Sequence, residues 1–240
     1  MKFMLIKYKL LPKSPISIGT GKSAQGIANN IVVRSANGIA YIPGSSIKGI
    51  LRSECRRFAQ TFGFYTHDKN LDPLGCLNHT KNSPCLLCKL FGSVHYPSNL
   101  IFENISLNST VTNILERLAL NISEKSVFEA QVIEKISSYG QSIRSNNRID
   151  PKTRTAANDH LFFTECVDPD TYFIGEIRSS SNCKVTKTEL AFLAMLLQSV
   201  NFIGGRKSAG LGRCLINIEQ FIFEGENLDW KKTIEGNSNA

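Results

Sequence analysis

The first 53 residues of this chain contain no aspartate and no glutamate. They carry eight lysines and arginines, and the other 20 basic residues are matched by all 20 acidic residues, so the formal charge of +8 comes entirely from this opening segment. A surface that only keeps a protein soluble mixes both signs, because crowded like charges repel one another. The distribution therefore favours an anionic partner such as a nucleic acid.

Long apolar runs are also missing, since none approaches the roughly 18 residues of a membrane span. The apolar N-terminus KFMLIKYKLL is interrupted by Lys7 and Lys9, so it predicts an opening strand rather than a signal peptide. We expect a cytoplasmic protein with no membrane partner. The seven cysteines are odd in number, and in a reducing compartment a cysteine cluster is better suited to metal binding than to disulfides.

A complete phosphate loop of a nucleoside triphosphatase is absent as well. Residues 17–23, SIGTGKS, resemble the end of the motif G-x-x-x-x-G-K-[ST], but Ile16 stands where the first glycine belongs. Gly26 and two asparagines follow where a long helix should begin. The sequence disfavours nucleotide hydrolysis, an alternative that would predict thermal stabilisation by ATP.

With 240 residues and 42% hydrophobic content, the chain can bury a substantial core. The pattern predicts a strand at the N-terminus, a hairpin over residues 30–43 with Asn37-Gly38 in its turn, and a closing strand over 214–223. Residues 186–200 predict a helix that packs on a sheet, and the tail from Glu224 is polar. This order suggests an α+β fold of ferredoxin or RNA-recognition type.

Residues 44–62, GSSIKGILRSECRRFAQTF, predict the other helix, with Ser45 or Ser46 as its N-cap. Lys48, Arg52 and Arg56 recur every four residues and form one stripe that is basic throughout, whereas an ordinary solvated face mixes signs. Gly49 costs about 1 kcal/mol relative to alanine inside a helix, which suggests that something packs closely there.

A cysteine cluster follows this helix, with the spacing Cys76-x2-His79-x5-Cys85-x2-Cys88. Three thiolates and one imidazole complete a tetrahedron and leave no position for a reacting water, so the spacing predicts a structural Zn²⁺. His67 or His95 could replace a ligand, and the alternative is that the cysteines are simply buried. A zinc deaminase is excluded because no glutamate lies two residues after either upstream histidine.

Two further patterns suit a nucleic acid. Glycine loops at 19–23 and 204–213 allow a phosphodiester chain to approach the backbone, and cations flank both. Residues 144–163 place four cations around turn-forming residues 150–153, with Phe162 and Phe163 following, which suits a single-stranded nucleic acid. The alternative for these phenylalanines is a place in the core.

The segments YIPGSSIKGILRSECRRF, CLLCKLFGS, RIDPKTRTAANDHLFF and GGRKSAGLGRC together resemble the RAMP proteins of type III CRISPR effector complexes, above all the repeated backbone subunit. The resemblance implies one domain over residues 1–240 with a modified ferredoxin-like or RNA-recognition fold. It also implies a zinc-binding insertion at 64–93, a thumb hairpin within 125–180 and a polar tail at 224–240. The implied partners are guide RNA, target RNA, other RAMP subunits and a large effector subunit.

The resemblance also implies sites. Carried over by position, the guide contacts are Gly21, Lys22, Ser45, Ser46, Lys48, Arg52, Gly205, Arg206 and Lys207, and the thumb covers about residues 137–163. The charge and glycine patterns add Gly19, Arg56, Arg148, Arg154 and Gly204 to the expected RNA-binding residues.

Catalytic members of the family have an aspartate shortly before the first hairpin strand, whereas this chain has Ala28 or Asn29 there. A neutral amide neither binds a divalent cation strongly nor acts as a base. We therefore expect a guide-binding subunit without its own nuclease activity. One alternative is a Mg²⁺-dependent endoribonuclease that uses Asp150 or Asp159 of the thumb and cuts target RNA at six-nucleotide intervals. Another is a zinc-stabilised RNA-binding module outside any complex.

Overall fold

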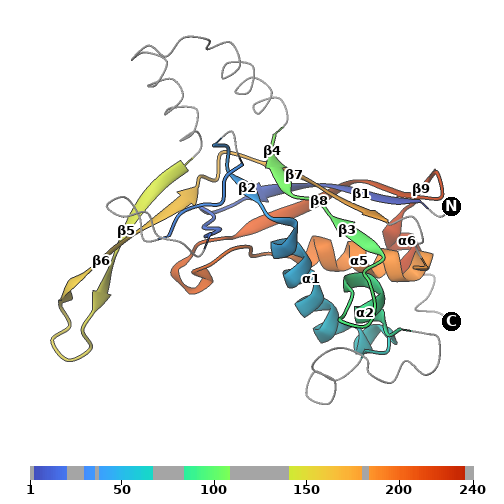
Figure 1. Ribbon diagram of the computed structural model, residues 1–240, viewed down its shortest axis with the longest axis horizontal. Helices are drawn as coiled ribbons and strands as arrows, with labels where there is room; N and C mark the ends of the chain where they lie inside the picture. Colours follow the sequence, from blue (N-terminus) through green and yellow to red (C-terminus); the bar gives the residue numbers. More distant parts are fainter. Residues whose placement is uncertain are drawn as a thin grey trace, which may run out of the picture.

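The computed structural model describes residues 3–20, 30–35, 38–66, 84–108, 141–179 and 184–235, which form a mixed α+β fold with antiparallel sheets (Figure 1). The main sheet has seven strands in the order β2-β4-β7-β1-β8-β9, and β3 also pairs with β7. Its strands are β1 (Met4–Pro12), β2 (Tyr41–Ile42), β3 (Leu100–Phe102), β4 (Ile105–Leu107), β7 (Phe173–Ser179), β8 (Cys214–Phe223) and β9 (Glu226–Asn227).

The helices α1, α2 and α5 lie on one face of this sheet (Figure 1). The helical elements are α1 (Gly44–Phe58), α2 (Leu86–Phe91), α5 (Lys187–Ser199), α6 (Trp230–Glu235) and two 3-10 turns, η1 (Gln60–Phe62) and η2 (Lys207–Ala209). The predicted opening strand and both long helices are confirmed. None of the described helices is long and apolar enough to cross a membrane.

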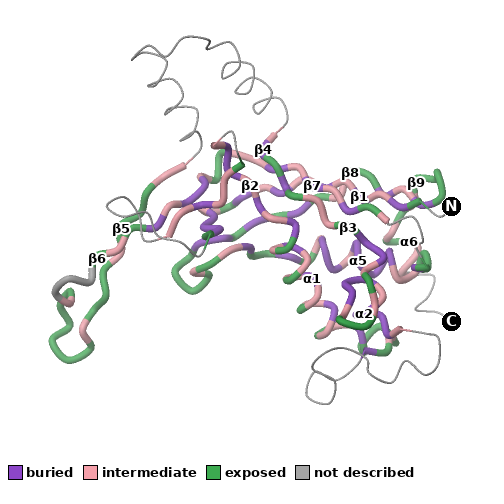
Figure 2. The backbone as a smooth tube through the Cα atoms, viewed as in Figure 1, coloured by how far each residue is buried: buried purple, intermediate pink, exposed green. Residues whose placement is uncertain are grey.

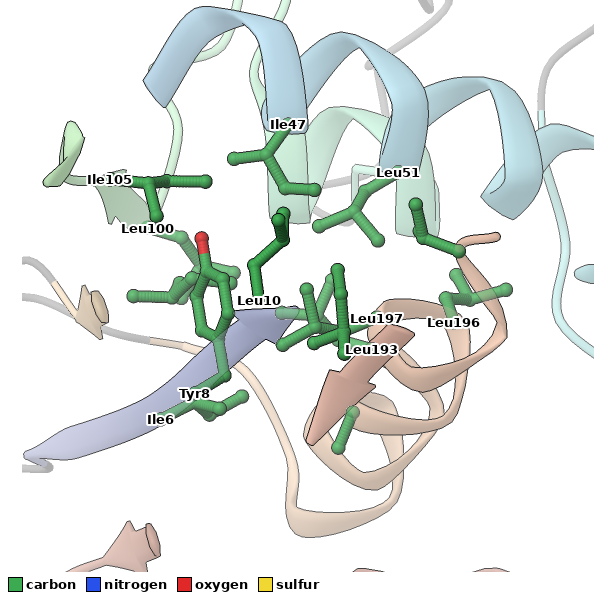
Figure 3. Close-up of a cluster of buried hydrophobic side chains, with 14 of the residues drawn as sticks. Ile6, Tyr8, Leu10, Ile47, Leu51, Leu100, Ile105, Leu193, Leu196 and Leu197 are labelled. Atoms are coloured by element: carbon green, nitrogen blue, oxygen red, sulfur yellow. The ribbon is translucent and has the colours of Figure 1, made fainter. Parts of the chain in front are cut away.

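The core lies between β1 and the two long helices. Every second residue of β1 is buried, and Tyr8 and Leu10 meet Ile47 of α1 and Leu193 of α5 in the cluster of Figure 3. Gly175 of β7 lies opposite Tyr8, and an added Cβ there would come within 2.3 Å of the phenol ring, so only glycine leaves room for Tyr8. Among the described residues the Tyr8 hydroxyl has no hydrogen-bond partner, and burial raises the pKa of Tyr8.

The helix α5 begins with a capping box, in which Thr186 accepts a hydrogen bond from the Glu189 backbone N–H and Glu189 accepts one from the Thr186 N–H. Glu189 has a second function, since its two carboxylate oxygens each lie 2.8 Å from Lys89 Nζ of α2. This largely buried ion pair joins α2 to α5.

A second, two-stranded sheet consists of β5 (Gln141–Ile149) and β6 (Ala156–Val167), and it extends away from the body (Figure 1). Its turn follows the prediction, because the Arg154 N–H donates to the Asp150 carbonyl and the Lys152 N–H donates to the Asp150 carboxylate. Figure 2 shows that the hairpin is mostly exposed, in contrast to the body.

Two expectations for α1 were wrong, one for its N-cap and one for Gly49 inside it. Pro43 is the N-cap of α1, and Ser45 and Ser46 lie inside its first turn. The cap serine is unnecessary because the Asn104 side chain accepts from the Gly44 N–H. Among the described residues nothing lies within 4 Å of a Cβ added at Gly49, so the close packing expected there is absent.

Some elements within the ranges of the expected insertions and tail pack with the body of the molecule. The strand β7 lies inside the range 125–180 but pairs with β1 in the main sheet, and α2 lies inside 64–93 with Leu87 and Leu90 fully buried. In the range 224–240, Trp230 and Ile234 of α6 pack against the core. These two apolar side chains hold α6 against the core, although the sequence of this tail is mostly polar.

Candidate nucleic-acid interface

The helix α1 presents Lys48, Arg52 and Arg56 beside its buried face, and all three are half-buried. The ion pairs of the described residues include none of them, whereas the neighbouring Arg57 pairs with Glu54. The Nη1 group of Arg52 donates to the Gly92 carbonyl over 3.1 Å. Burial, and next the charge of Arg52, lower the pKa of Lys48. The helix thus carries a row of positive charges that no carboxylate of the described residues neutralises.

The C-terminal glycine loop packs against the N-terminal loop, although the two are about 190 residues apart in sequence. The Gly205 N–H donates to the Ser17 carbonyl over 2.9 Å, and the Gly212 N–H donates to the Pro15 carbonyl over 2.9 Å. Gly204 has a φ of +86°, and an added Cβ there would lie 2.4 Å from the Ser17 carbonyl oxygen. Glycine is therefore required where the two loops meet.

Arg206 extends this contact to the hairpin. Its guanidinium lies over the Phe162 ring of β6, with 4.4 Å between the guanidinium carbon and the ring centre. Arg206 has the left-handed backbone conformation, with a φ of 57°, which is uncommon for a residue other than glycine. Lys207 follows it and is exposed. The structure therefore places the predicted residues Gly204 and Gly205 against Ser17, and Arg206 against Phe162 in the middle of the hairpin.

The hairpin has two different faces. Residues opposite one another in the register share a face, which places Ile143, Leu161 and Phe163 on one side and Arg144 and Phe162 on the other. Neither phenylalanine belongs to the buried core, so the core alternative for them is wrong. The expected RNA contacts Arg148 and Arg154 are exposed at and near its tip.

The base of the hairpin contains a cluster that sequence reasoning missed. Arg34 forms an ion pair with Glu165 of β6 and also donates to the Gln141 side chain and, over 3.0 Å, to the Gly38 carbonyl. The second Glu165 oxygen accepts from the Val32 N–H over 2.9 Å. Arg34 is one of the eight cations of the acid-free opening segment, but its partners lie within the protein, and it joins the hairpin to the N-terminal segment. Its partner lies 131 residues away, so no local signal indicates the pair.

The remaining expected residues are placed only in part. Gly19 pairs with Val32 in an isolated bridge, while Gly21, Lys22, Ala28 and Asn29 lie outside the described residues. Cys76, His79 and His67 also lie outside them. Within the described ranges no three side chains of metal-binding type come together, so His95 does not form such a group with Cys85 and Cys88.

Cys85 is the N-cap of α2, and Cys88 lies three residues later in the first turn of that helix. Both side chains are buried. Two thiols at this spacing are the donor chemistry of half a zinc site. Burial raises the pKa of the Cys55 thiol to about 12 and that of the Cys214 thiol to about 11. These two remain protonated at neutral pH and do not act as nucleophiles.

Comparison with known proteins agrees with this arrangement. A family model described as the RAMP superfamily matches residues 9–215, so the chain belongs to the RAMP superfamily. No curated protein matches the sequence.

Two solved structures have the same fold. One is described as the type III-B Cmr-beta bound to cognate target RNA, with a TM-score of 0.58, 13% identity, and coverage of 89% of this chain and 96% of that chain. The other is type III-B Cmr-beta in the apo state, with a TM-score of 0.55, 12% identity, and coverage of 90% and 97%. At these identities the likeness shows the fold alone.

Proposed function

We propose that this chain is a guide-RNA-binding backbone subunit of a type III CRISPR ribonucleoprotein. The observation that carries the proposal is the α1 row of Lys48, Arg52 and Arg56, which no ion pair of the described residues neutralises. Such a row suits a chain of phosphates, because each contact releases counterions from the RNA. Membership of the RAMP superfamily and the fold shared with Cmr-beta support the same assignment.

The two glycine loops and the hairpin base support a continuous RNA path. Gly205 contacts Ser17, and Arg206 contacts Phe162, so backbone groups, a cation and an aromatic ring lie close together. In the proposed function the loops bind the guide backbone, and the hairpin, with Arg148 and Arg154 exposed, is the thumb. Lys22 and Gly21 belong to this path by their place in the sequence.

The fold proposal is a single ferredoxin-like domain with insertions. The strands β3 and β4 together occupy one position, which gives the sheet order β8-β1-β7-β3/β4 with α1 and α5 on one face. Four antiparallel strands and two helices in this order are the ferredoxin-like arrangement. The hairpin β5–β6 interrupts it between β4 and β7.

The test is RNA binding by the full chain at several salt concentrations. The variant Lys48→Gln with Arg52→Gln should weaken binding of any single-stranded RNA and lower the slope of log affinity against log salt by about 0.7 for each lost phosphate contact. Arg57→Gln, on the same helix but paired with Glu54, is the matched control. An unchanged slope in the double variant would remove α1 from the RNA path.

Assembly provides a second test. Co-expression with a guide RNA and the other subunits of the complex should yield a ribonucleoprotein that contains several RAMP subunits and a large effector subunit. A chain that binds RNA but remains a monomer in gel filtration would instead fit the zinc-stabilised module outside any complex.

We propose that the subunit does not cleave target RNA. Asp150 is engaged in its own turn, where it accepts the Lys152 N–H over 2.8 Å, so its carboxylate already has a structural function. The alternative, a Mg²⁺-dependent nuclease, predicts products at six-nucleotide intervals from the assembled complex. Asp150→Asn and Asp159→Asn would then abolish these products, while full-length target in the unmodified complex supports the proposal.

We also propose a structural Zn²⁺ bound by Cys76, His79, Cys85 and Cys88. The buried thiols of Cys85 and Cys88 at the start of α2 support it. Metal analysis of the purified chain should find about one zinc per chain, and Cys88→Ser should lower both the zinc content and the melting temperature. A zinc-free protein of unchanged stability would contradict the proposal.

A further inference from the structure

A groove of about 440 Å³ lies between α1 and the segment that follows α2. Lys48 and Arg52 form one wall, and the other consists of residues 91–94 and 96–98. Its volume lies in the range of roughly 300–1,000 Å³ that is typical of clefts for small ligands.

The charge in the groove is uncompensated. The two cations are one helical turn apart, and no carboxylate is found among the described residues that line the groove. Each cation therefore repels the other in a partly desolvated place, and an anion between them would relieve this repulsion.

The opposite wall has a backbone conformation that is fixed by a glycine turn and by hydrogen bonds. Gly92 has a φ of +76°, and an added Cβ would lie 2.9 Å from the Ser98 nitrogen, so the chain turns there only with glycine. The Ser93 and Tyr96 backbones exchange hydrogen bonds of 2.7 and 3.3 Å, and the Ser98 hydroxyl donates to the Leu90 carbonyl over 2.7 Å. Arg52 donates to the Gly92 carbonyl, which fixes its guanidinium at this wall. The site is thus preorganised for a ligand.

One polar group in this wall lacks a partner. The Ser93 hydroxyl oxygen is buried and forms no hydrogen bond with the described residues. Burying a hydroxyl without a partner is unfavourable, and a ligand can hydrogen-bond to this oxygen once the Ser93 side chain turns toward the groove. Tyr96 and the exposed Val94 add an aromatic ring and an apolar edge.

We propose that this groove binds one nucleotide of the RNA, with its phosphate at Lys48 and Arg52 and its base against Tyr96. The proposal deepens the proposed function and rests on it. A carboxylate of a protein partner could also meet the cations. The polyanion is favoured because the row continues to Arg56, each step being about 6 Å along the helix axis, so repeated phosphates can meet all three cations.

The test separates stacking from charge in the full-length protein, with a labelled single-stranded RNA oligonucleotide as the probe. Tyr96→Ala should raise the Kd about ten-fold, because one base–ring stack is lost, while the salt slope stays unchanged because no phosphate contact is lost. Tyr96→Phe should restore most of the affinity. A structural role of Tyr96 alone would instead lower the melting temperature without this pattern.

A second variant does not depend on the packing of Tyr96. Val94 is 73% exposed, so Val94→Asp should fold normally and place a negative charge at the edge of the groove. It should raise the Kd several-fold. Phe3→Asp makes the same charge change at another exposed apolar residue, at the N-terminal end of β1, and should have a smaller effect.

The outcomes distinguish this proposal from the function on which it rests. If the unmodified chain binds RNA with a steep salt dependence, and neither Tyr96→Ala nor Val94→Asp weakens binding more than Phe3→Asp, the nucleotide site is wrong and the proposed function stands. If the unmodified chain binds no RNA, the proposed function fails first. If both groove variants keep their RNA affinity but no longer assemble with partner subunits, the groove is a protein contact and the proposal is overturned.

Discussion

In the body of the molecule β1 buries every second side chain beneath α1 and α5, whereas the hairpin β5–β6 leaves Ile143, Ile149 and Leu161 more than half exposed. Figure 2 shows the same contrast along the chain. An isolated two-stranded hairpin is marginally stable in water, so this one depends on its attachment. The attachment at its base combines the Arg34–Glu165 ion pair with the Ile16–Val167 backbone bridge, whose two side chains are buried in the core.

This difference shows that different interactions hold the two regions in place. Burial of apolar side chains stabilises the body, because it removes area from water at about 25 cal/mol per Å². The hairpin is instead oriented by a few directional contacts, and its exposed surface remains available to a partner. Substitutions should therefore affect global unfolding in the body and local opening in the hairpin.

The largest expected effect compares the same change in both regions. Leu10→Ala, at a fully buried position of β1, should lower the free energy of unfolding by about 2–5 kcal/mol. Leu161→Ala, 56% exposed on β6, should change it by less than about 0.5 kcal/mol. Urea denaturation measures both. Equal losses would show that the hairpin contributes to the same cooperative core.

The next effect is a local one. Arg34→Met removes the charge that pairs with Glu165 and should weaken the hairpin attachment by about 1–3 kcal/mol. Limited trypsin digestion should then cleave faster within residues 141–167, with little change in global unfolding. Arg57→Met breaks the more exposed Glu54 pair and serves as the control, with an expected cost below about 1 kcal/mol. Unchanged cleavage would mean that backbone bridges alone hold the hairpin.

The body could largely be predicted from the sequence because its signals are local. The alternation in β1 is visible in a short window of sequence, and the structure confirms the opening strand. The capping box of Thr186 and Glu189 is likewise a local pattern at the start of the predicted second helix. The N-cap of α1 could not be predicted, because the Gly44 N–H is satisfied by Asn104, 60 residues away. The strands β2, β3, β4 and β9 are only two or three residues long and leave no periodic signal.

The candidate site could be predicted as a set of residue types but not as an arrangement. The α1 row is a local pattern, so its spacing follows from the helix. The contacts from Gly205 to Ser17 and from Arg206 to Phe162 join distant segments, and only the sheet topology brings them together. Arg34 shows the limit most clearly, because a charge count cannot tell a ligand-binding cation from one with an internal partner.

A smaller change in stability is expected at Tyr8, a fully buried residue of the body. The Tyr8 hydroxyl is buried without a hydrogen-bond partner among the described residues. Tyr8→Phe keeps the ring opposite Gly175 and removes this oxygen, so it should raise the free energy of unfolding by about 1 kcal/mol. Thermal denaturation measures the change. A loss of stability would show that the hydroxyl is bonded to water or to another part of the chain.

The smallest expected effect is at Gly49, where the body meets the proposed RNA surface. Gly49→Ala should stabilise the protein by about 0.5–1 kcal/mol, because alanine is the better helix former and nothing described lies within 4 Å of its Cβ. Gly44→Ala is the contrasting control, since its Cβ would lie 2.1 Å from the Phe102 carbonyl oxygen and should destabilise. If RNA lies along Lys48 and Arg52, the added methyl group at Gly49 should weaken RNA binding while it stabilises the free chain. Stabilisation with unchanged RNA affinity would place the RNA away from this part of α1. The single substitution Gly49→Ala therefore separates the effect of α1 on stability from its effect on RNA binding.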